Sequence, residues 1–455
     1  MLGDDDRRFE TILQEIARVD GVDLRCGPLS DKHSDMASSP FAFYRGTAGL
    51  YYRDLKDEVI DLEVAPSSKT RIQGDCHFEN LGFVTEGGAW AGPAWVHFCP
   101  NDYDDAGVGH AEWDLVRYAV SLFLAADRAR CDDEGTYVDW PCDRLRTSPG
   151  FAAARPAVKA FLKRYRKTCA AIVDDPVDRW DSVVDGFKGK HFLASYEKKA
   201  KKRAVHGDHF LKKSKLAKAS DLKSQTPRLK HQRGRLERLL GPRAGMVDAV
   251  FRPYVDDTIC DLAVRLDAGL GARDADRYYL LVGPKVDELE GEDWRSVMEL
   301  YHLVEVKEQR PPAFLAHFPD LDPANRMPSA HLVIDSQRLM QRHPDRVLDE
   351  VVWNDSHWLI RTRHHAKVGV DADELADGDI ADNILDHAKA SGRAVALAHG
   401  RSDKRSVRFE RHMCERLSKP AIGHLVDLAE AYAERVIHDW VLVRRLVRER
   451  TPSNA

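Results

Sequence analysis

Gly74-Asp75-Cys76-His77-Phe78-Glu79-Asn80 is the most informative stretch of this 455-residue chain, and Asn101-Asp102-Tyr103-Asp104-Asp105 follows it. In the first stretch an Asp and an Asn lie five positions apart after a glycine. Phosphoryl transfer requires such a set, because one carboxylate orients and deprotonates the acceptor hydroxyl while an amide and another carboxylate hold Mg²⁺ on the donor phosphates. The two stretches therefore predict a phosphoryl-transfer site.

Residues 75 to 115 resemble the catalytic and metal-binding segments of aminoglycoside and choline phosphotransferases. The resemblance implies that Asp75 is the catalytic base, that Asn80 and Asp102 are metal ligands, and that Asp114 braces the loop. We also assign Asp104 to the metal ligands. Two residues depart from the pattern: Gln73 stands where it has its first His, and Asp104 where it often has Gly.

Each piece has an ordinary explanation by itself, because Gly-Asp is a common turn and an acidic cluster is commonly a solvated loop. Their order is what favours the kinase-type hypothesis. Trp95-Val96-His97-Phe98 predicts a short strand that delivers Asp102 to a strand end.

The composition is typical of a soluble cytoplasmic protein of two or three domain-sized units, with 43% hydrophobic residues. The eight cysteines are scattered, which favours reduced thiols over a disulfide framework or a zinc module. The N-terminus does not resemble a secretory signal, and no apolar run approaches the roughly 18 residues of a membrane span. We expect no membrane contact.

Positive charge is concentrated in residues 188 to 243, where eighteen Lys or Arg face four acidic residues. The net charge of the whole chain is −5, so this segment is basic and the remainder acidic. A solvated helical hairpin or mobile insertion is the favoured interpretation, and a binding surface the alternative. Nucleic acid is an unlikely partner because no zinc finger or RNP-type aromatic set is present. An anionic acceptor is compatible with the charge.

Apolar periodicity predicts helices and strands along the chain. Helices are expected at 9–18, 115–126, 380–399 and 422–448, and mostly helix over 155–243. Strands are expected at 261–266, 278–282, 299–308 and 358–361.

The strand region provides what a nucleotide-binding small lobe needs. Gly269 and Gly271 form a glycine turn whose amides would lie near phosphates, and Lys307 ends a third strand as their charged partner. This region follows the catalytic loop instead of preceding it. The chain is therefore predicted to be a circular permutation of the kinase order, which is allowed where native termini lie close together.

Longer motifs are similar, in order, to those of the domain of unknown function 2252 family, over residues 36 to about 445. They are Met36–Gly46, Gly74–Asn80, Asn101–Asp104, Val306–Glu308, Gln337–Gln341 and Leu397–Ser402. This resemblance implies a kinase-like fold and names no substrate. Asp274 replaces the third glycine of the family's usual turn, and an acid near phosphates is repulsive unless it points away or binds metal.

Further candidates complete the predicted site. Arg45 follows an apolar run and is either an anion clamp or a brace for Asp102 or Asp114. His77 either supports the loop or touches the substrate. The predicted partner of Lys307 is one of three residues: Glu308, Gln337 or Arg361.

The expected architecture is α+β, a permuted two-lobed fold like that of protein kinases and aminoglycoside phosphotransferases, with a mainly helical large lobe and a small antiparallel sheet. Residues 1–249 should form the catalytic part of the large lobe with the basic insertion, 250–365 the small lobe, and 366–455 the helices that complete the large lobe. The expected function is ATP- and Mg²⁺-dependent phosphotransfer to a hydroxyl. Two alternatives are a catalytically silent nucleotide- or partner-binding protein and a metal-dependent hydrolase built on Asp75, His77, Asp102 and Asp104.

Overall fold

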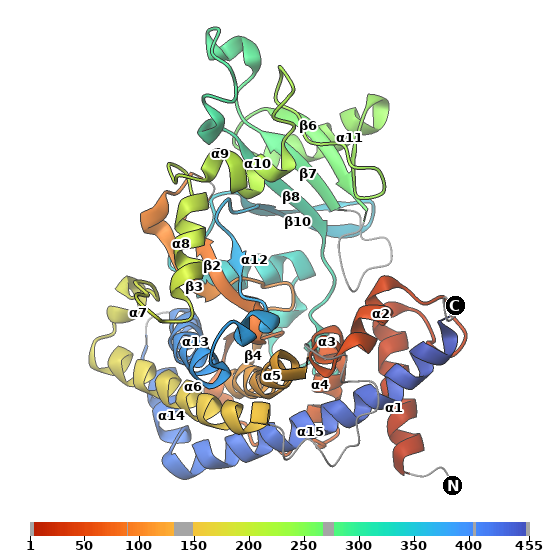
Figure 1. The fold of residues 1–455 in the computed structure, drawn as a ribbon, viewed down its shortest axis with the longest axis vertical. Helices are drawn as coiled ribbons and strands as arrows, with labels where there is room; N and C mark the ends of the chain where they lie inside the picture. Colours follow the sequence, from red (N-terminus) through yellow and green to blue (C-terminus); the bar gives the residue numbers. More distant parts are fainter. Residues whose placement is uncertain (1–3, 89, 132–148, 267–276, 404–405, 452–455) are drawn as a thin grey trace.

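The computed structural model describes residues 4–88, 90–131, 149–266, 277–403 and 406–451. A helical part lies at the bottom of Figure 1 and a sheet part at the top. The helical part contains segments from both ends of the chain, and the sheet part comes from the middle. No helix in the described ranges combines the length and apolar character needed to cross a membrane.

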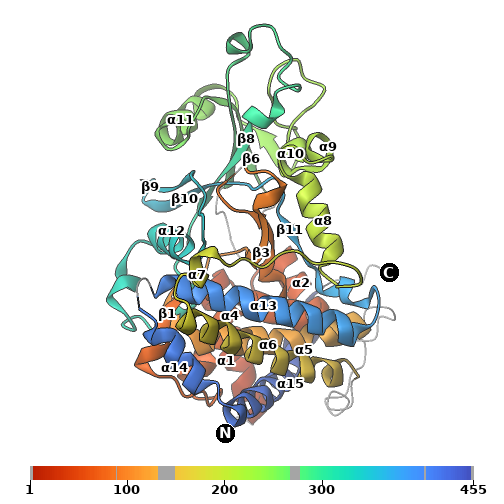
Figure 2. The ribbon, with the colours of Figure 1, turned by 90° about the vertical axis from the view of Figure 1, so that its left-hand side faces the viewer.

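The helical part is built around α5, which is buried on nearly all sides. Helix α13 packs along α6, and α15 crosses beneath both α5 and α6 (Figure 2). The helices are α1 (Asp4–Asp20), α2 (Asp31–Ser38), α3 (Pro40–Gly46), α4 (Ala48–Lys56), α5 (Ala111–Cys131), α6 (Pro149–Asp174), α7 (Asp178–Asp181), α13 (Ile380–Ser402), α14 (Arg408–Arg416) and α15 (Lys419–Arg450). The helices predicted at both ends of the chain and after the Asp102 loop are confirmed.

The sheet part contains six antiparallel strands in the order β5-β6-β7-β8-β10-β9. The strands are β5 (Leu236–Arg238), β6 (Ile259–Arg265), β7 (Arg277–Val282), β8 (His302–Glu308), β9 (Leu348–Trp353) and β10 (Ser356–Thr362). The helices of this part are α8 (Ala194–Arg203), α9 (Phe210–Lys213), α10 (Lys215–Ala219), α11 (Gly241–Phe251) and α12 (Ser329–Met340). The four strands predicted here are confirmed as β6, β7, β8 and β10.

Two smaller sheets connect these parts and carry the predicted site. Strands β1 (Lys69–Ile72) and β4 (Gly107–His110) form one antiparallel pair on either side of the catalytic loop. The other sheet has the order β11-β2-β3. Its strands are β2 (Leu81–Thr85), β3 (Val96–Pro100) and β11 (Val368–Gly369). As predicted, β3 ends just before Asp102.

The six-stranded sheet has one apolar face and one face that is charged around Lys307. Lys307 is opposite Arg277 on β7, and Glu305 is opposite Arg361 on β10. Directly paired residues share a face, as do residues two apart on one strand, so all four side chains lie on the same face. The other face packs against α11 through Val247, Phe251, Tyr278, Leu280, Val304, Val306 and Ile360.

The predicted boundary at residue 250 and the predicted nature of the basic segment need correction. Strand β5 already belongs to the large sheet, since it pairs with β6. The basic segment is not a solvated hairpin or mobile insertion, because its apolar residues are buried in both parts of the molecule. They are Leu193, Tyr196, Ala200, Leu216, Leu229 and Leu236. Little of residues 204–243 is helical, so the expectation of continuous helix to residue 243 is also wrong there.

Candidate functional site

A cleft of about 750 Å³ opens between the catalytic loop, the N-terminal helices and the end of β8. Seven of the predicted site residues line it: Arg45, Asp75, Asn80, Asp102, Asp104, Lys307 and Glu308. They come from three segments that are far apart in the sequence. The folded chain therefore brings the predicted base, metal ligands and phosphate-binding lysine to one cavity.

The catalytic loop is held from beneath by Asp114 of α5. Its carboxylate accepts hydrogen bonds from the backbone N–H of Gln73 (2.7 Å) and of Gly74 (3.0 Å). His399 Nε2 lies 3.1 Å from the same carboxylate, and the Tyr165 hydroxyl lies 2.9 Å from His399 Nδ1. The bracing role that the resemblance implied for Asp114 is thus visible in its contacts, and the Leu397–Ser402 motif contributes to it through His399.

Arg117, also on α5, grips the predicted base. Its Nε and Nη2 lie 2.7 and 2.5 Å from Oδ1 of Asp75, and its side chain has no exposed surface. Burial opposes ionisation of Asp75, but the charges of Arg117 and His77 outweigh it, so the pKa of this carboxyl lies below its usual value. Asp75 is therefore a carboxylate fixed in position at neutral pH.

Asn80 and Asp102 retain oxygens suited to a hard cation. The Asn80 amide nitrogen donates to the Asp75 carbonyl (2.9 Å), which orients the amide and leaves its oxygen as the ligand atom. Burial and the neighbouring Asp104 raise the pKa of Asp102, because no cation among the described residues forms an ion pair with it. A buried carboxylate without a counter-charge fits a divalent cation.

The described residues contain no group of three His, Cys, Asp or Glu side chains able to hold a metal ion. Mg²⁺ does not require such a group, since it keeps several waters and is bound through one or two carboxylates together with substrate phosphates. Asp102 and the Asn80 amide therefore fit Mg²⁺, whereas Asp104 is already engaged by a lysine.

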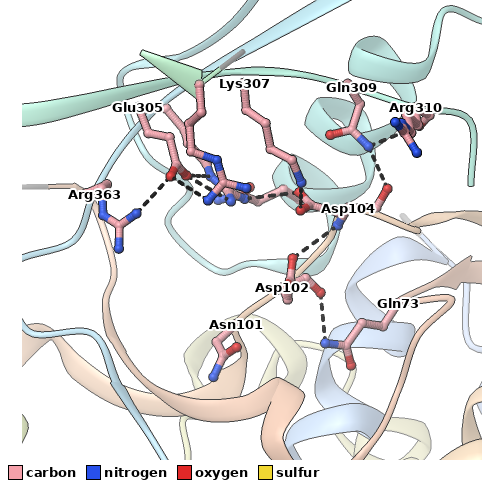
Figure 3. Close-up of polar contacts among 12 residues, drawn as sticks. Gln73, Asn101, Asp102, Asp104, Glu305, Lys307, Gln309, Arg310 and Arg363 are labelled. Atoms are coloured by element: carbon pink, nitrogen blue, oxygen red, sulfur yellow. Dashed lines mark hydrogen bonds and ion pairs between the residues drawn. The ribbon is translucent and has the colours of Figure 1, made fainter. Parts of the chain in front are cut away.

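Lys307 reaches from β8 to Asp104 and forms an ion pair with its carboxylate (Figure 3). Gln309 strengthens this junction by donating from Nε2 to the Asp104 carbonyl (2.7 Å), and Asp105 accepts from the Ala313 N–H (2.7 Å). Burial would raise the pKa of Asp104, but Lys307 and Arg361 reverse the effect and lower it. The acidic loop is thus clamped to the strand that carries the lysine.

None of the three predicted partners of Lys307 fills that role, since its partner is Asp104. Glu308 accepts a hydrogen bond from the Ser356 hydroxyl (2.5 Å), and Gln337 contacts Gln341 within the same helix. Arg361 pairs with Glu305 (3.2 Å) and lies 3.6 Å from Asp104. A partner from a distant loop could not be identified from residues near Lys307 in sequence.

Arg45 and His77 have contacts that their sequence context left open. Arg45 lines the cleft and pairs with Glu79 (2.6 Å), so the predicted brace for Asp102 or Asp114 is wrong. His77 is buried, and its Nε2 lies 3.6 Å from Asp75. Burial lowers the pKa of His77 to about 3, so the ring is neutral and supports the loop without lining the cleft.

Asp105 lies in the same cleft beside Asp75 and was not among the predicted site residues. Burial and the charge of Asp75 raise its pKa to about 7. The cleft therefore contains two neighbouring carboxyl groups with opposite pKa shifts, one held ionised by Arg117 and one that titrates near neutrality. The predicted glycine turn at Gly269 and Gly271, together with Asp274, lies outside the described residues.

Arg117 and Gln73 are the main site residues that sequence reasoning missed. Arg117 is three positions after Asp114 on one helix, so the two share a face, and this spacing was an available signal. Gln73 donates from Nε2 to the carbonyls of Asn80 (2.9 Å) and Asp102 (2.8 Å). The residue noted as a departure from the phosphotransferase pattern therefore joins the two predicted loops.

Comparison with known proteins gives one finding. A family model described as "Uncharacterized protein conserved in bacteria (DUF2252)" matches residues 28–138 and 148–446. Neither the curated proteins nor the solved structures gave a significant match.

Proposed function

The chain belongs to the bacterial DUF2252 family, and we propose that it is an ATP- and Mg²⁺-dependent phosphotransferase that acts on a hydroxyl-bearing small molecule or protein. The observation that carries the proposal is the cleft itself. Asp75, Asn80, Asp102 and Lys307 line one cavity although Lys307 is more than 200 residues away from the others. The residue types match the parts of a phosphoryl-transfer site.

The proposed architecture is that of a kinase in permuted order. Lys307 lies on the third of three successive antiparallel strands, β6, β7 and β8, and α12 follows them. A kinase small lobe has its phosphate-binding lysine on the third strand and a helix after it. Here the catalytic loop precedes these strands, and α13 to α15 follow them to complete the helical part.

In the proposed reaction Asp75 orients the acceptor hydroxyl and accepts its proton. Arg117 fixes the position of this carboxylate, which lowers its basicity but removes the cost of orienting it. Lys307 would neutralise donor phosphates, and Asp102 with Asn80 would hold Mg²⁺, which supplies charge neutralisation on the phosphates when bound. The acceptor would enter from the side of the cleft lined by Arg45.

A catalytically silent nucleotide-binding protein is the second candidate. The tight Asp75–Arg117 pair favours it, because a carboxylate saturated by a guanidinium is a weaker base. The two candidates share the nucleotide site and differ in turnover.

The test is transfer of labelled phosphate from ATP, with Mg²⁺, to components of a cell extract. We expect transfer by the wild-type chain, and a loss of about 100-fold or more in Asp75→Asn and Asp102→Asn variants with unchanged melting temperatures. Lys307→Met should weaken nucleotide binding, whereas Lys285→Met, at an exposed loop of the same part, should not. ATP binding without any transfer would support the silent candidate, and full activity of Asp75→Asn would contradict the proposal.

A further inference from the structure

A second, smaller cavity of about 220 Å³ adjoins the cleft. Asp102, Asp104 and Arg277 line both cavities, so the two share a wall. The remaining lining residues come from β3 and its following loop, α10, β8, α12, β10 and the segment before β11. The ones used below are Lys215, Glu305, Arg361, Arg363 and Lys367.

The cavity has more cations than carboxylates. Glu305 is surrounded by three guanidinium groups, those of Arg277 (3.3 Å), Arg361 (3.2 Å) and Arg363 (2.8 Å). These charges outweigh the effect of burial and hold the pKa of Glu305 well below its usual value. One carboxylate cannot neutralise three cations, so positive charge remains on this wall (Figure 3).

Two lysines add to this excess. Lys367 donates from Nζ to a carbonyl, that of Asn101 (2.8 Å), and not to a carboxylate. No acidic side chain in the described part of the chain forms an ion pair with Lys215. Burial and the nearby Arg363 and Lys367 lower the pKa of Lys215 to about 8. Cations gathered without counter-charges are stabilised by a bound anion.

We propose that this second cavity binds phosphate oxyanions and holds the polyphosphate chain of the phosphoryl donor. The inference deepens the proposed function and rests on it for the identity of the donor. Guanidinium and ammonium groups converging from α10, β7, β10 and the segment before β11 provide the fork-shaped and point-charge donors that phosphate oxygens accept. The shared wall places that chain beside Asp102, the proposed metal ligand.

The size and lining of the cavity exclude a nucleobase as its occupant. Its volume is below the roughly 300–1,000 Å³ of sites that enclose larger organic ligands, which are lined mainly by apolar and aromatic groups. Among its described lining residues only Val84 and Tyr103 are apolar or aromatic. The donor would therefore be recognised here by its phosphates.

Lys215 is the residue that tests this proposal most cleanly. Its backbone N–H donates to the His365 carbonyl (3.2 Å), and the preceding Ser214 hydroxyl caps α10 by accepting from the Ala217 N–H (3.0 Å). Neither contact involves the ammonium group. Lys213, two positions earlier, is exposed and provides a matched control.

The experiment is isothermal titration of the full chain with sodium tripolyphosphate and, separately, with ATP. We expect Lys215→Met to weaken the binding of both about tenfold, the effect of losing one charged hydrogen bond. Lys215→Arg should retain most of the affinity, and Lys213→Met should match the wild type. Melting temperatures of all three variants should be close to that of the wild type.

Loss of tripolyphosphate affinity alone would support the anion site but overturn its assignment to the nucleotide donor in favour of free inorganic polyphosphate. Unchanged affinity for both ligands in a folded Lys215→Met variant would overturn the site itself. Because titration needs no transfer, this result is separate from the turnover test of Asp75.

Discussion

Gly74 is the point at which the catalytic loop touches the acidic loop. Its φ is +79°, a left-handed conformation that favours glycine. A Cβ atom at this position would lie 1.9 Å from the Asp105 carbonyl oxygen, far inside van der Waals contact. The backbone of the predicted base therefore rests directly on the backbone of the predicted metal loop.

We predict that Gly74→Ala costs more stability than Gly21→Ala and also reduces phosphate transfer. Gly21 has a similar φ of +67°, but a Cβ there meets nothing within 4 Å, so this variant reports the backbone strain alone, about 1–2 kcal/mol. Gly74→Ala adds the displacement of Asp105. Urea unfolding and labelled transfer measure the two effects. Equal stabilities with full activity would show that the two loops separate without cost.

Residue identities in the site were predictable where chemistry depends on local spacing. Asp75, Asn80 and Asp102 were identified because a base, an amide and a strand-end carboxylate occur in a recognisable order. The partner of Lys307 was not, because Asp104 is about 200 residues away and only the folded chain brings it near. Lys215 was missed for the same reason, and because the charge of its segment resembled an ordinary solvated surface.

Elements with strong periodicity were predicted well, and short ones in charged sequence were not. Strands β6, β7 and β8 alternate or are continuously apolar, whereas β5 has three residues and only one of them is buried. Such a strand forms because the edge of β6 is available to pair with it, which is a tertiary effect that residue patterns do not reveal. The sheet boundary was misplaced for that reason.

The contact between α13 and α14 predicts how stability depends on pH. Glu410 of α14 is fully buried against α13, near Arg179 (3.3 Å), and burial raises the pKa of this carboxyl to about 7. The folded chain therefore binds a proton that the unfolded chain releases between about pH 4.5 and 7. Stability from this group is lost as the pH rises through that window.

We accordingly predict that Glu410→Gln gains stability relative to the wild type by roughly 1–3 kcal/mol between pH 5 and pH 8. Urea unfolding at several pH values in this range measures the difference. Glu415→Gln, an exposed position on the same helix, should show no such trend. A constant difference between Glu410→Gln and wild type across the range would mean that Glu410 titrates at its ordinary pKa.

At the scale of the whole molecule, Arg8 ties the first helix to the last. Its guanidinium pairs with Asp54 (2.5 Å) and with Asp439 of α15 (2.5 Å), and the Tyr432 hydroxyl donates to Asp54 (2.6 Å). All of these groups are buried. The network joins segments more than 400 residues apart in the sequence.

We predict that Arg8→Met destabilises the chain by about 3–5 kcal/mol, because it leaves two buried carboxylates without a counter-charge. Arg25→Met removes an arginine whose ion pairs with Glu10 and Asp23 are exposed, and should cost less than about 1 kcal/mol. Chemical denaturation compares the two. Similar small losses in both variants would show that α1 contributes little to the stability of the helical part.

The core of the helical part, which runs from Ile12 to Val447, also has a consequence for synthesis. A chain emerging from the ribosome presents α5 long before α13 and α15 exist to cover it, while the sheet of residues 236–362 is complete earlier and closes on itself. The nascent protein thus holds a large sticky surface exposed for most of its translation, and it requires chaperone protection until its last hundred residues arrive.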